Sequence, residues 1–218
     1  MTEHAVAVET TIAAPFAAVW NALRDPAEIR RWHGWEYDAD GGLDAEIDVI
    51  YHQGVTADEA SGTITISDGS QFVLEDRGGE TFVRVTMPAS AGRSWDEYYD
   101  DIREGWTSFV GQLRFALEQH PGEDRRTLHL SGPGTLGVAA GAPGEPYAGT
   151  TSWGEPLSGR VLLRTAHQLG LIVDAYGPGL AIVHAKPDGG GMAIVTAYGF
   201  DDAAFADLER RWRAGYAR

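Results

Sequence analysis

The sequence predicts an α+β protein in which a long helix closes an antiparallel strand meander. A second, partial meander follows and ends in a helix of its own. Three observations predict this arrangement. A strand end and then two short helical segments, between residues 15 and 30, precede the meander. Runs of β-branched and aromatic residues then alternate with Asp-Gly and Gly-Gly turn signals. An apolar stripe with helical spacing covers residues 94–120.

The first helix is predicted to begin at Pro15, because a proline in the first turn lacks only an N–H that would have no partner there. The Asp25-Pro26 step ends this helix and opens a second short one through Ile29, since the residue before a proline avoids the α region. The second helix then runs into Trp32 and Trp35. The apolar side of the first helix consists of Phe16, Val19, Trp20 and Leu23.

The next part of the chain favours strands with one buried face. The Asp68-Gly69 step is a strong hairpin signal, because both central residues of the tightest hairpin turn have positive φ. Alternation places Val83 and Val85 on one face and Arg84 on the other. The expected strands are Ile47–His52, Gly62–Ser67, Gln71–Asp76 and Thr81–Met87. An alternating acidic run favours a solvated strand face, with a cation-binding surface as the weaker alternative: Glu36, Asp38, Asp40, Asp44, Glu46 and Asp48.

A long helix is predicted from an N-cap at Ser94 to about His120. Acidic residues at its start and Arg114 near its end suit the helix dipole. About 25 residues span roughly 37 Å, which is long enough to cross a whole sheet. The apolar stripe consists of Trp95, Tyr99, Ile102, Trp106, Phe109, Leu113 and Leu117.

Residues 123–159 are predicted to form a linker or a lid, because Gly132–Ser158 is rich in Gly and Pro and shows no period; Arg126–Leu130 is a possible strand before it. Trp153 and Tyr147 are unusual in a pure linker and favour one that docks on a surface. Residues 160–218 are predicted to form a degenerate second half unit; the alternative is an extension that completes one enlarged sheet. The expected elements are strands at Arg160–Thr165, Gly170–Ala175, Leu180–Lys186 and Met192–Tyr198, and a helix at Asp202–Tyr216.

The opening segment, TIAAPFAAVWNALRDPAEIRRWHGW, resembles the START-related, birch-pollen-allergen-like superfamily, also called SRPBCC proteins. The shared pattern is I-x-A-P-x-x-x-V-W-x-A-L-x-D-P-x-x-x-x-x-W. It is matched by Ile12, Ala14, Pro15, Val19, Trp20, Ala22, Leu23, Asp25, Pro26 and Trp32. Within the superfamily, the chain looks most like homologues of the heat-shock-protein-90 ATPase activator. The resemblance implies a helix-grip fold for residues 1–122, with a curved antiparallel sheet gripping the long helix.

The resemblance also implies a cavity between the sheet and the long helix. The residues expected to line it are Trp32, Trp35, Tyr37, Tyr51, Phe72, Trp106, Phe109, Val110 and Leu113. Taken singly, each of these side chains is better explained as filling core volume, because an aromatic stripe at helical spacing usually does; taken as a set, the resemblance favours a ligand pocket.

Three functions follow from this resemblance, in decreasing rank. The first is binding of a small hydrophobic or aromatic molecule of unknown identity. The second is a cyclase or aromatase-type enzyme that uses the same cavity. Its acid–base candidates are His52, Tyr51, Glu75 and Arg84, and His52 is the one to test as a proton donor. The third is a chaperone-interaction module.

Composition limits the classes of partner and cofactor that the protein is expected to bind. A net charge of −15 argues against a nucleic-acid partner, which would require clustered Lys and Arg. The absence of cysteine excludes disulfides, thiolate metal sites and cysteine nucleophiles. The seven histidines lack metal-ligand spacing, so we expect no metal and no cofactor.

The sequence favours a cytoplasmic location. Its first ten residues, MTEHAVAVET, lack the basic and apolar regions of a secretory signal. No apolar run approaches the roughly 20 residues of a membrane helix, so membrane insertion is not expected. The richness in Ala and Gly, with a single lysine, suggests a bacterial coding sequence. A homodimer is left open.

Overall fold

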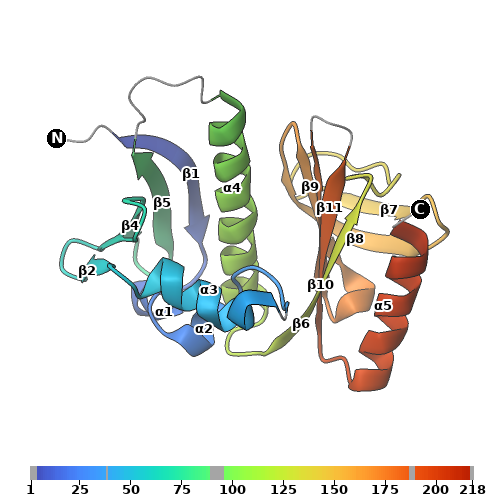
Figure 1. Ribbon diagram of the computed structural model, residues 1–218, viewed down its shortest axis with the longest axis horizontal. Helices are drawn as coiled ribbons and strands as arrows, with labels where there is room; N and C mark the ends of the chain where they lie inside the picture. The colour runs from blue at the N-terminus through green and yellow to red at the C-terminus, as the bar shows by residue number, and fades with distance from the viewer. Residues whose placement is uncertain (1–3, 38, 89–95, 187–189, 217–218) are drawn as a thin grey trace. The chain divides into compact units, whose positions relative to one another are not determined.

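The computed structural model describes residues 4–37, 39–88, 96–186 and 190–216. The chain divides into two compact units, residues 1–123 (unit 1) and 124–218 (unit 2). Each unit contains one antiparallel sheet and at least one helix packed on it, so the α+β class is confirmed (Figure 1). Asp38, the N-cap at Ser94, and Trp95 lie outside the described residues, as do the side chains of Tyr99 and Ile102.

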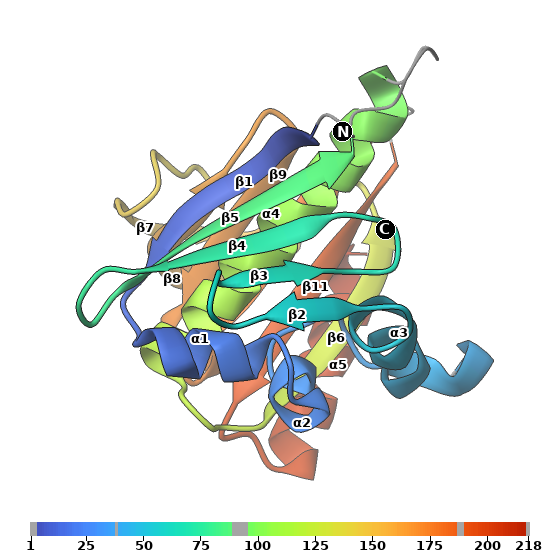
Figure 2. The ribbon, with the colours of Figure 1, turned by 90° about the vertical axis from the view of Figure 1, so that its left-hand side faces the viewer.

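Unit 1 is built on a five-stranded antiparallel sheet with the order β1-β5-β4-β3-β2, which Figure 2 shows face on. Its strands are β1 (His4–Ile12), β2 (Thr56–Asp58), β3 (Thr63–Thr65), β4 (Gln71–Asp76) and β5 (Thr81–Pro88). The first strand therefore pairs with the last one, with Ile12 opposite Thr81. The long helix α4 (Asp96–Gln119) then packs across the sheet beside β1 (Figure 1).

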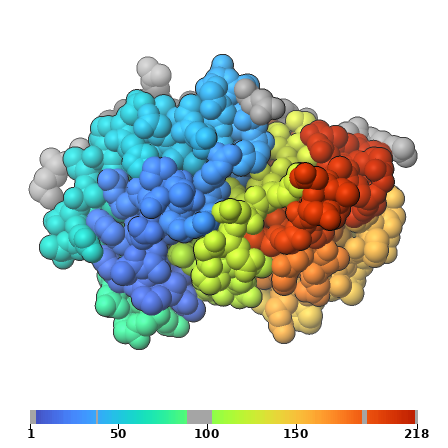
Figure 3. All heavy atoms as spheres, turned by 90° about the horizontal axis from the view of Figure 1, so that it is seen from below, coloured from blue at the N-terminus to red at the C-terminus, as the bar shows by residue number. Residues whose placement is uncertain are grey.

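The opening helices are α1 (Phe16–Ala22) and α2 (Pro26–Arg30), as the sequence predicts. Pro15 is the N-cap of α1. Asp25 caps α2, because its Oδ1 accepts the N–H of Ala27 at 2.8 Å. α1 and α2, in blue, adjoin the light-blue segment that contains α3 on the face seen in Figure 3.

The expected strand at Ile47–His52 is wrong, because these residues belong to a helix, α3 (Gly42–Tyr51). The buried residues Leu43, Ile47 and Tyr51 are spaced by four, which is the helical period. The β-branched and aromatic residues of this segment, and the alternation of acids at positions 44, 46 and 48, favoured a strand although the buried residues follow the helical spacing. A short 3₁₀ turn, η1 (Ala39–Gly41), precedes this helix.

The predicted hairpin between β3 and β4 is confirmed, but its turn is wider than expected. The Ile66 N–H donates to the Ser70 carbonyl at 2.9 Å, which leaves three residues in the loop. Gly69 has φ = 85°, whereas Asp68 is not in the positive region. A three-residue loop needs left-handed backbone at one position only, so the expectation of two positive φ values is wrong.

Unit 2 has its own six-stranded antiparallel sheet, so the alternative of one enlarged sheet is wrong. The strand order is β6-β11-β10-β9-β8-β7, and again the first strand pairs with the last before a closing helix. The strands are β6 (Arg125–Gly132), β7 (Pro146–Thr150), β8 (Pro156–Arg164), β9 (Gln168–Val173), β10 (Gly179–Ala185) and β11 (Gly191–Tyr198). A 3₁₀ turn, η2 (Asp174–Tyr176), follows β9, and the closing helix is α5 (Asp202–Tyr216).

Residues 123–159, expected as a linker or lid, carry β6, β7 and the start of β8. β7 could not be predicted from the sequence, because it is a short edge strand in which Tyr147 is the one buried residue. Tyr147 and Trp153 both pack on the core of unit 2, in agreement with the prediction that these two residues dock on a surface. Among the described residues, none of the helices is long and apolar enough to cross a bilayer.

Gly62 occupies a position where a side chain would collide with backbone. It has φ = +65°, and a Cβ there would lie 2.2 Å from the Leu74 carbonyl oxygen. Gly54 has a similar φ of +67° but open space around it. We expect Gly54→Ala to lower the free energy of unfolding by about 1 kcal/mol, and Gly62→Ala by about 2–3 kcal/mol. Urea titration of the two variants checks this, and equal losses would contradict the steric explanation.

Candidate functional site

The structure brings most of the predicted lining residues together in the core of unit 1. Trp32, Tyr51, Phe72, Trp106, Val110 and Leu113 are buried members of this core. Tyr37 and Phe109 are partly buried and pack against it. Trp35 is half-buried and does not belong to the cluster. Whether any of these residues contacts a ligand stays a prediction.

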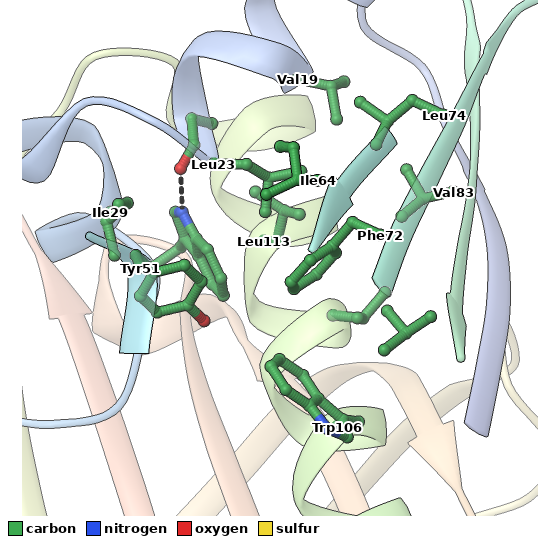
Figure 4. Close-up of a cluster of buried hydrophobic side chains, with 14 of the residues drawn as sticks. Val19, Leu23, Ile29, Tyr51, Ile64, Phe72, Leu74, Val83, Trp106 and Leu113 are labelled. Atoms are coloured by element: carbon green, nitrogen blue, oxygen red, sulfur yellow. Dashed lines mark hydrogen bonds between the residues drawn. The ribbon is translucent and has the colours of Figure 1, made fainter. Parts of the chain in front are cut away.

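Five aromatic side chains, which we call the ring cluster, form a continuous series: Trp32, Tyr51, Phe72, Trp106 and Phe109. Successive ring centroids lie 5.7, 6.4, 5.2 and 6.1 Å apart, three of the four contacts being edge-on. Figure 4 shows Tyr51 from α3, Phe72 from β4 and Trp106 from α4 in this series. Trp106 of α4 thus contacts Phe72 of β4 edge-on.

A polar group lies within this apolar surrounding. The His33 ring is fully buried and lies 4.5 Å from the Phe109 ring and 5.0 Å from the Tyr51 ring. Its Nδ1 is 2.9 Å from the Tyr51 hydroxyl, and its Nε2 is 3.3 Å from Glu46 Oε1. The Tyr37 hydroxyl donates to the other Glu46 oxygen at 3.0 Å. Tyr51, His33 and Glu46 therefore form one hydrogen-bonded chain.

Local structure positions each member of this chain. The indole N–H of Trp32 donates to the Ala22 carbonyl at the end of α1, at 2.7 Å, and this bond holds the segment that carries His33. Gly34, with φ = +58°, turns the chain directly afterwards. Glu46 and Tyr51 both come from α3, so formation of that helix determines where the carboxylate and the hydroxyl lie.

Electrostatics favour a charged carboxylate and neutral hydroxyls. The hydrogen bond with His33 lowers the pKa of Glu46, although partial burial opposes the shift. Burial raises the pKa of Tyr51 well above 10, and the nearby Glu46 charge adds to this. Burial also raises the pKa of Tyr37, with a contribution from its hydrogen bond to Glu46. Near neutral pH, Glu46 is thus ionised and both phenols keep their protons.

The protons in the chain can be assigned from these charges. An ionised carboxylate only accepts hydrogen bonds, so His33 Nε2 carries the proton that faces Glu46. In a neutral imidazole the other nitrogen then accepts, which makes the Tyr51 hydroxyl the donor to His33 Nδ1.

The remaining polar candidates lie elsewhere. His52 follows α3 rather than ending a strand, and its buried Nε2 has no hydrogen-bond partner among the described residues. Glu75 is exposed and lies 3.2 Å from Arg77. Arg84 lies on the sheet face opposite Val83 and Val85 and bonds Glu9 at 2.6 Å. Glu75 and Arg84 are therefore not part of the ring cluster, and a catalytic role for His52 stays a prediction.

The sequence reasoning missed His33 and Glu46. The alternating acids place Glu46 on a solvated strand face, and His33 is one scattered histidine among seven. The helical spacing of Leu43, Ile47 and Tyr51 is the signal that could have identified α3. Within the described ranges, no cluster of three or more His, Asp or Glu side chains could hold a metal ion.

The lowered pKa of Glu46 predicts a loss of stability in acid. A carboxyl whose folded pKa lies below its unfolded value stabilises the protein above the unfolded value, and this contribution disappears as the pH falls through the folded pKa. Relative to Glu46→Gln, the wild type should therefore lose unfolding free energy as the pH falls from about 5 to about 3. Urea titrations of both proteins across this range check this; parallel curves would contradict it.

Comparison with known proteins finds similar solved structures. No family profile matches the chain, and no curated protein matches it significantly. One similar solved structure is DynU16, a protein in the dynemicin biosynthetic locus: 17% identity, TM-score 0.36, covering 99% of this chain and 95% of that one. Another is the di-domain ARO/CYC StfQ from the steffimycin biosynthetic pathway: 13% identity, TM-score 0.38, covering 96% of this chain and 91% of that one.

The resemblance to homologues of the heat-shock-protein-90 ATPase activator gains no support from these comparisons.

Proposed function

We propose that unit 1 binds a small aromatic or hydrophobic molecule between α4 and the sheet, beside Tyr51. The ring cluster supplies the apolar surface that such a ligand requires. Binding sites for small molecules are mostly apolar, with a few polar groups that orient the ligand. Tyr51 is the polar group here, because its hydroxyl lies among the rings and His33 fixes it at 2.9 Å.

The observation that supports this proposal most directly is the burial of a titratable chain in an apolar surrounding. Volume alone can be filled by leucine or phenylalanine without any polar group. Instead, His33 is fully buried against Phe109, and Tyr51 is 1% exposed. Groups with strongly shifted pKa values in such places are enriched at functional sites.

Ligand entry would require rings to move. Trp106 touches Phe72 edge-on, and Phe109 lies at the partly exposed margin of the cluster. A rotation of Phe109 and a small shift of Trp106 would admit a flat molecule next to Tyr51. Side-chain rearrangements of this kind are common when proteins bind partners.

Binding can be located with two matched tryptophan variants. We expect 2-methoxynaphthalene, added to the purified protein, to change its tryptophan fluorescence. Trp106→Phe should remove a large part of this change, because Trp106 lies in the ring cluster. Trp212→Phe makes the same chemical substitution in unit 2 and should leave the change intact. Absence of any change in the wild type, or its loss in Trp212→Phe only, would contradict the proposal.

A second candidate function is a cyclase or aromatase-type enzyme at the same place. It is favoured by the chain itself, because the Tyr51 oxygen can take up a proton from the carbon beside a ligand carbonyl while its own proton moves to His33 Nδ1. The Glu46 charge then stabilises the imidazolium, and reversal of the transfer returns a proton to the ligand. The chaperone-interaction hypothesis has no comparable observation among the described residues.

The enzyme hypothesis can be tested with a simple ketone. We expect the protein to accelerate exchange of the methyl-ketone protons of 2-acetylnaphthalene for deuterium, followed by NMR in D₂O. Tyr51→Phe should reduce the protein-dependent rate on the order of 100-fold, which is typical for loss of a general acid or base. An exchange rate that is the same with and without protein would reject catalysis of this kind while leaving the binding proposal intact.

A further inference from the structure

We infer that the site selects aromatic ligands that donate a hydrogen bond, such as phenols, over the matching ethers and ketones. The selecting group is Tyr51, and the direction of the hydrogen bonds in the Tyr51–His33–Glu46 chain sets the preference. This inference rests on the proposed binding function and names the ligand class for the same site.

The direction of the chain begins at Glu46. Its two oxygens are occupied by two donors, the Tyr37 hydroxyl at 3.0 Å and His33 Nε2 at 3.3 Å. An ionised carboxylate has no proton to give, so both contacts must run toward it. The proton on His33 Nε2 is therefore used in the hydrogen bond to Glu46.

The position of the His33 proton determines the direction of the hydrogen bond with Tyr51. A neutral imidazole whose single proton is on Nε2 presents a lone pair at Nδ1, 2.9 Å from the Tyr51 hydroxyl. The single proton of that hydroxyl then points at His33. The Tyr51 oxygen then has no proton left to donate, and its lone pairs can only accept a hydrogen bond from a ligand.

The described surroundings of Tyr51 supply no donor to this oxygen. Its nearest rings are those of Trp32 at 5.7 Å and Phe72 at 6.4 Å. The Trp32 N–H is already bonded to the Ala22 carbonyl at 2.7 Å. A ligand hydroxyl can therefore satisfy the Tyr51 oxygen, whereas a ligand ether or carbonyl oxygen would place two acceptors face to face. A site built to bond a hydroxyl rejects analogues that lack it.

The test uses three probes with the same naphthalene ring: 2-naphthol, 2-methoxynaphthalene and 2-acetylnaphthalene. Equilibrium dialysis at about pH 8 measures the dissociation constant of each. We expect the wild type to bind 2-naphthol roughly 5- to 10-fold more tightly than the other two, which corresponds to about one neutral hydrogen bond. Tyr51→Phe should reduce this ratio to about one while it still binds 2-methoxynaphthalene.

Glu46→Gln separates hydrogen-bond direction from shape. The glutamine oxygen can still accept from Tyr37, and its amide N–H can then donate to His33 Nε2. The imidazole proton moves to Nδ1 and donates to Tyr51, which frees the Tyr51 proton for the ligand. The preference should therefore invert, with 2-acetylnaphthalene bound more tightly than 2-naphthol by a few-fold. A purely structural role of Glu46 would weaken all three probes together.

The outcomes are distinguishable. If none of the probes binds the folded wild type, the binding function itself is rejected. If the probes bind with equal affinity, or if the wild type prefers the ketone, binding stands and the inferred selectivity is overturned. If the preference for 2-naphthol persists in Tyr51→Phe or in Glu46→Gln, Tyr51 is not the selecting group. Circular dichroism of each variant establishes that it is folded.

Discussion

Replacing Trp212 with alanine is expected to destabilise unit 2 by about 3–5 kcal/mol, the usual cost of removing a fully buried tryptophan. Trp212 has no exposed surface, and its indole N–H donates to the Tyr176 hydroxyl at 2.8 Å. It also packs edge-on against Trp153, with centroids 5.2 Å apart. The substitution would therefore remove core volume and the contact that holds the segment carrying Trp153 on α5.

Hydrogen exchange of α5 and β10 during urea titration reports on unit 2 directly. Trp212→Phe is the intermediate variant, expected to lose about 1–2 kcal/mol because it keeps most of the volume but not the hydrogen bond. Arg210→Ala is the control, since Arg210 is exposed on the same helix and should change stability by less than about 0.5 kcal/mol. A loss below about 1 kcal/mol in Trp212→Ala would show that the site collapses around the missing ring.

Replacing Trp32 with alanine is expected to cost about 3–5 kcal/mol in unit 1. Trp32 is 1% exposed and contacts the Tyr51 ring edge-on at 5.7 Å. Its N–H also satisfies the Ala22 carbonyl at the end of α1, where helix carbonyls lack partners within the helix. Trp32→Phe keeps a ring but leaves this carbonyl unpaired, so we expect a loss of about 1–3 kcal/mol.

The Trp32 variants also test the connection between the core and the candidate site. His33 follows Trp32 directly, so a shifted Trp32 should displace the imidazole from Tyr51. We expect Trp32→Phe to lose the preference for 2-naphthol in conditions where it remains folded. Urea titration gives the stability and equilibrium dialysis the selectivity. An unchanged preference would show that α3 alone positions Tyr51 and His33.

Much of the architecture could be predicted because it rests on local signals. Pro15 and the Asp25-Pro26 step define the two opening helices by restricting the backbone at those residues. Period-2 alternation identifies β5, and the stripe that includes Trp106 and Leu113 identifies α4. In unit 2, Gly- and Pro-rich turns separate strands whose apolar residues repeat clearly. Each of these signals is contained within a window of a few residues.

The errors lie where local signals conflict or are weak. In residues 42–51 the acids alternate with period two while the apolar residues follow the helical period, and packing of Leu43, Ile47 and Tyr51 decides for the helix. β7 has little apolar pattern, so only its pairing with β8 defines it as a strand. An edge strand receives much of its structure from its neighbour, and the sequence of the strand alone does not contain that information.

The sequence by itself determined the α+β class, the opening helices, the long helix α4 and all five residues that form the ring cluster. Only the tertiary structure decided that the second half has its own sheet, and that Glu46, His33 and Tyr51 form one hydrogen-bonded chain. The physical reason is that periodicity reports which face of an element is buried, whereas a hydrogen bond depends on atomic positions within a few tenths of an ångström. Those positions are set by how α2, α3 and α4 pack together, and that packing exists only in the folded chain.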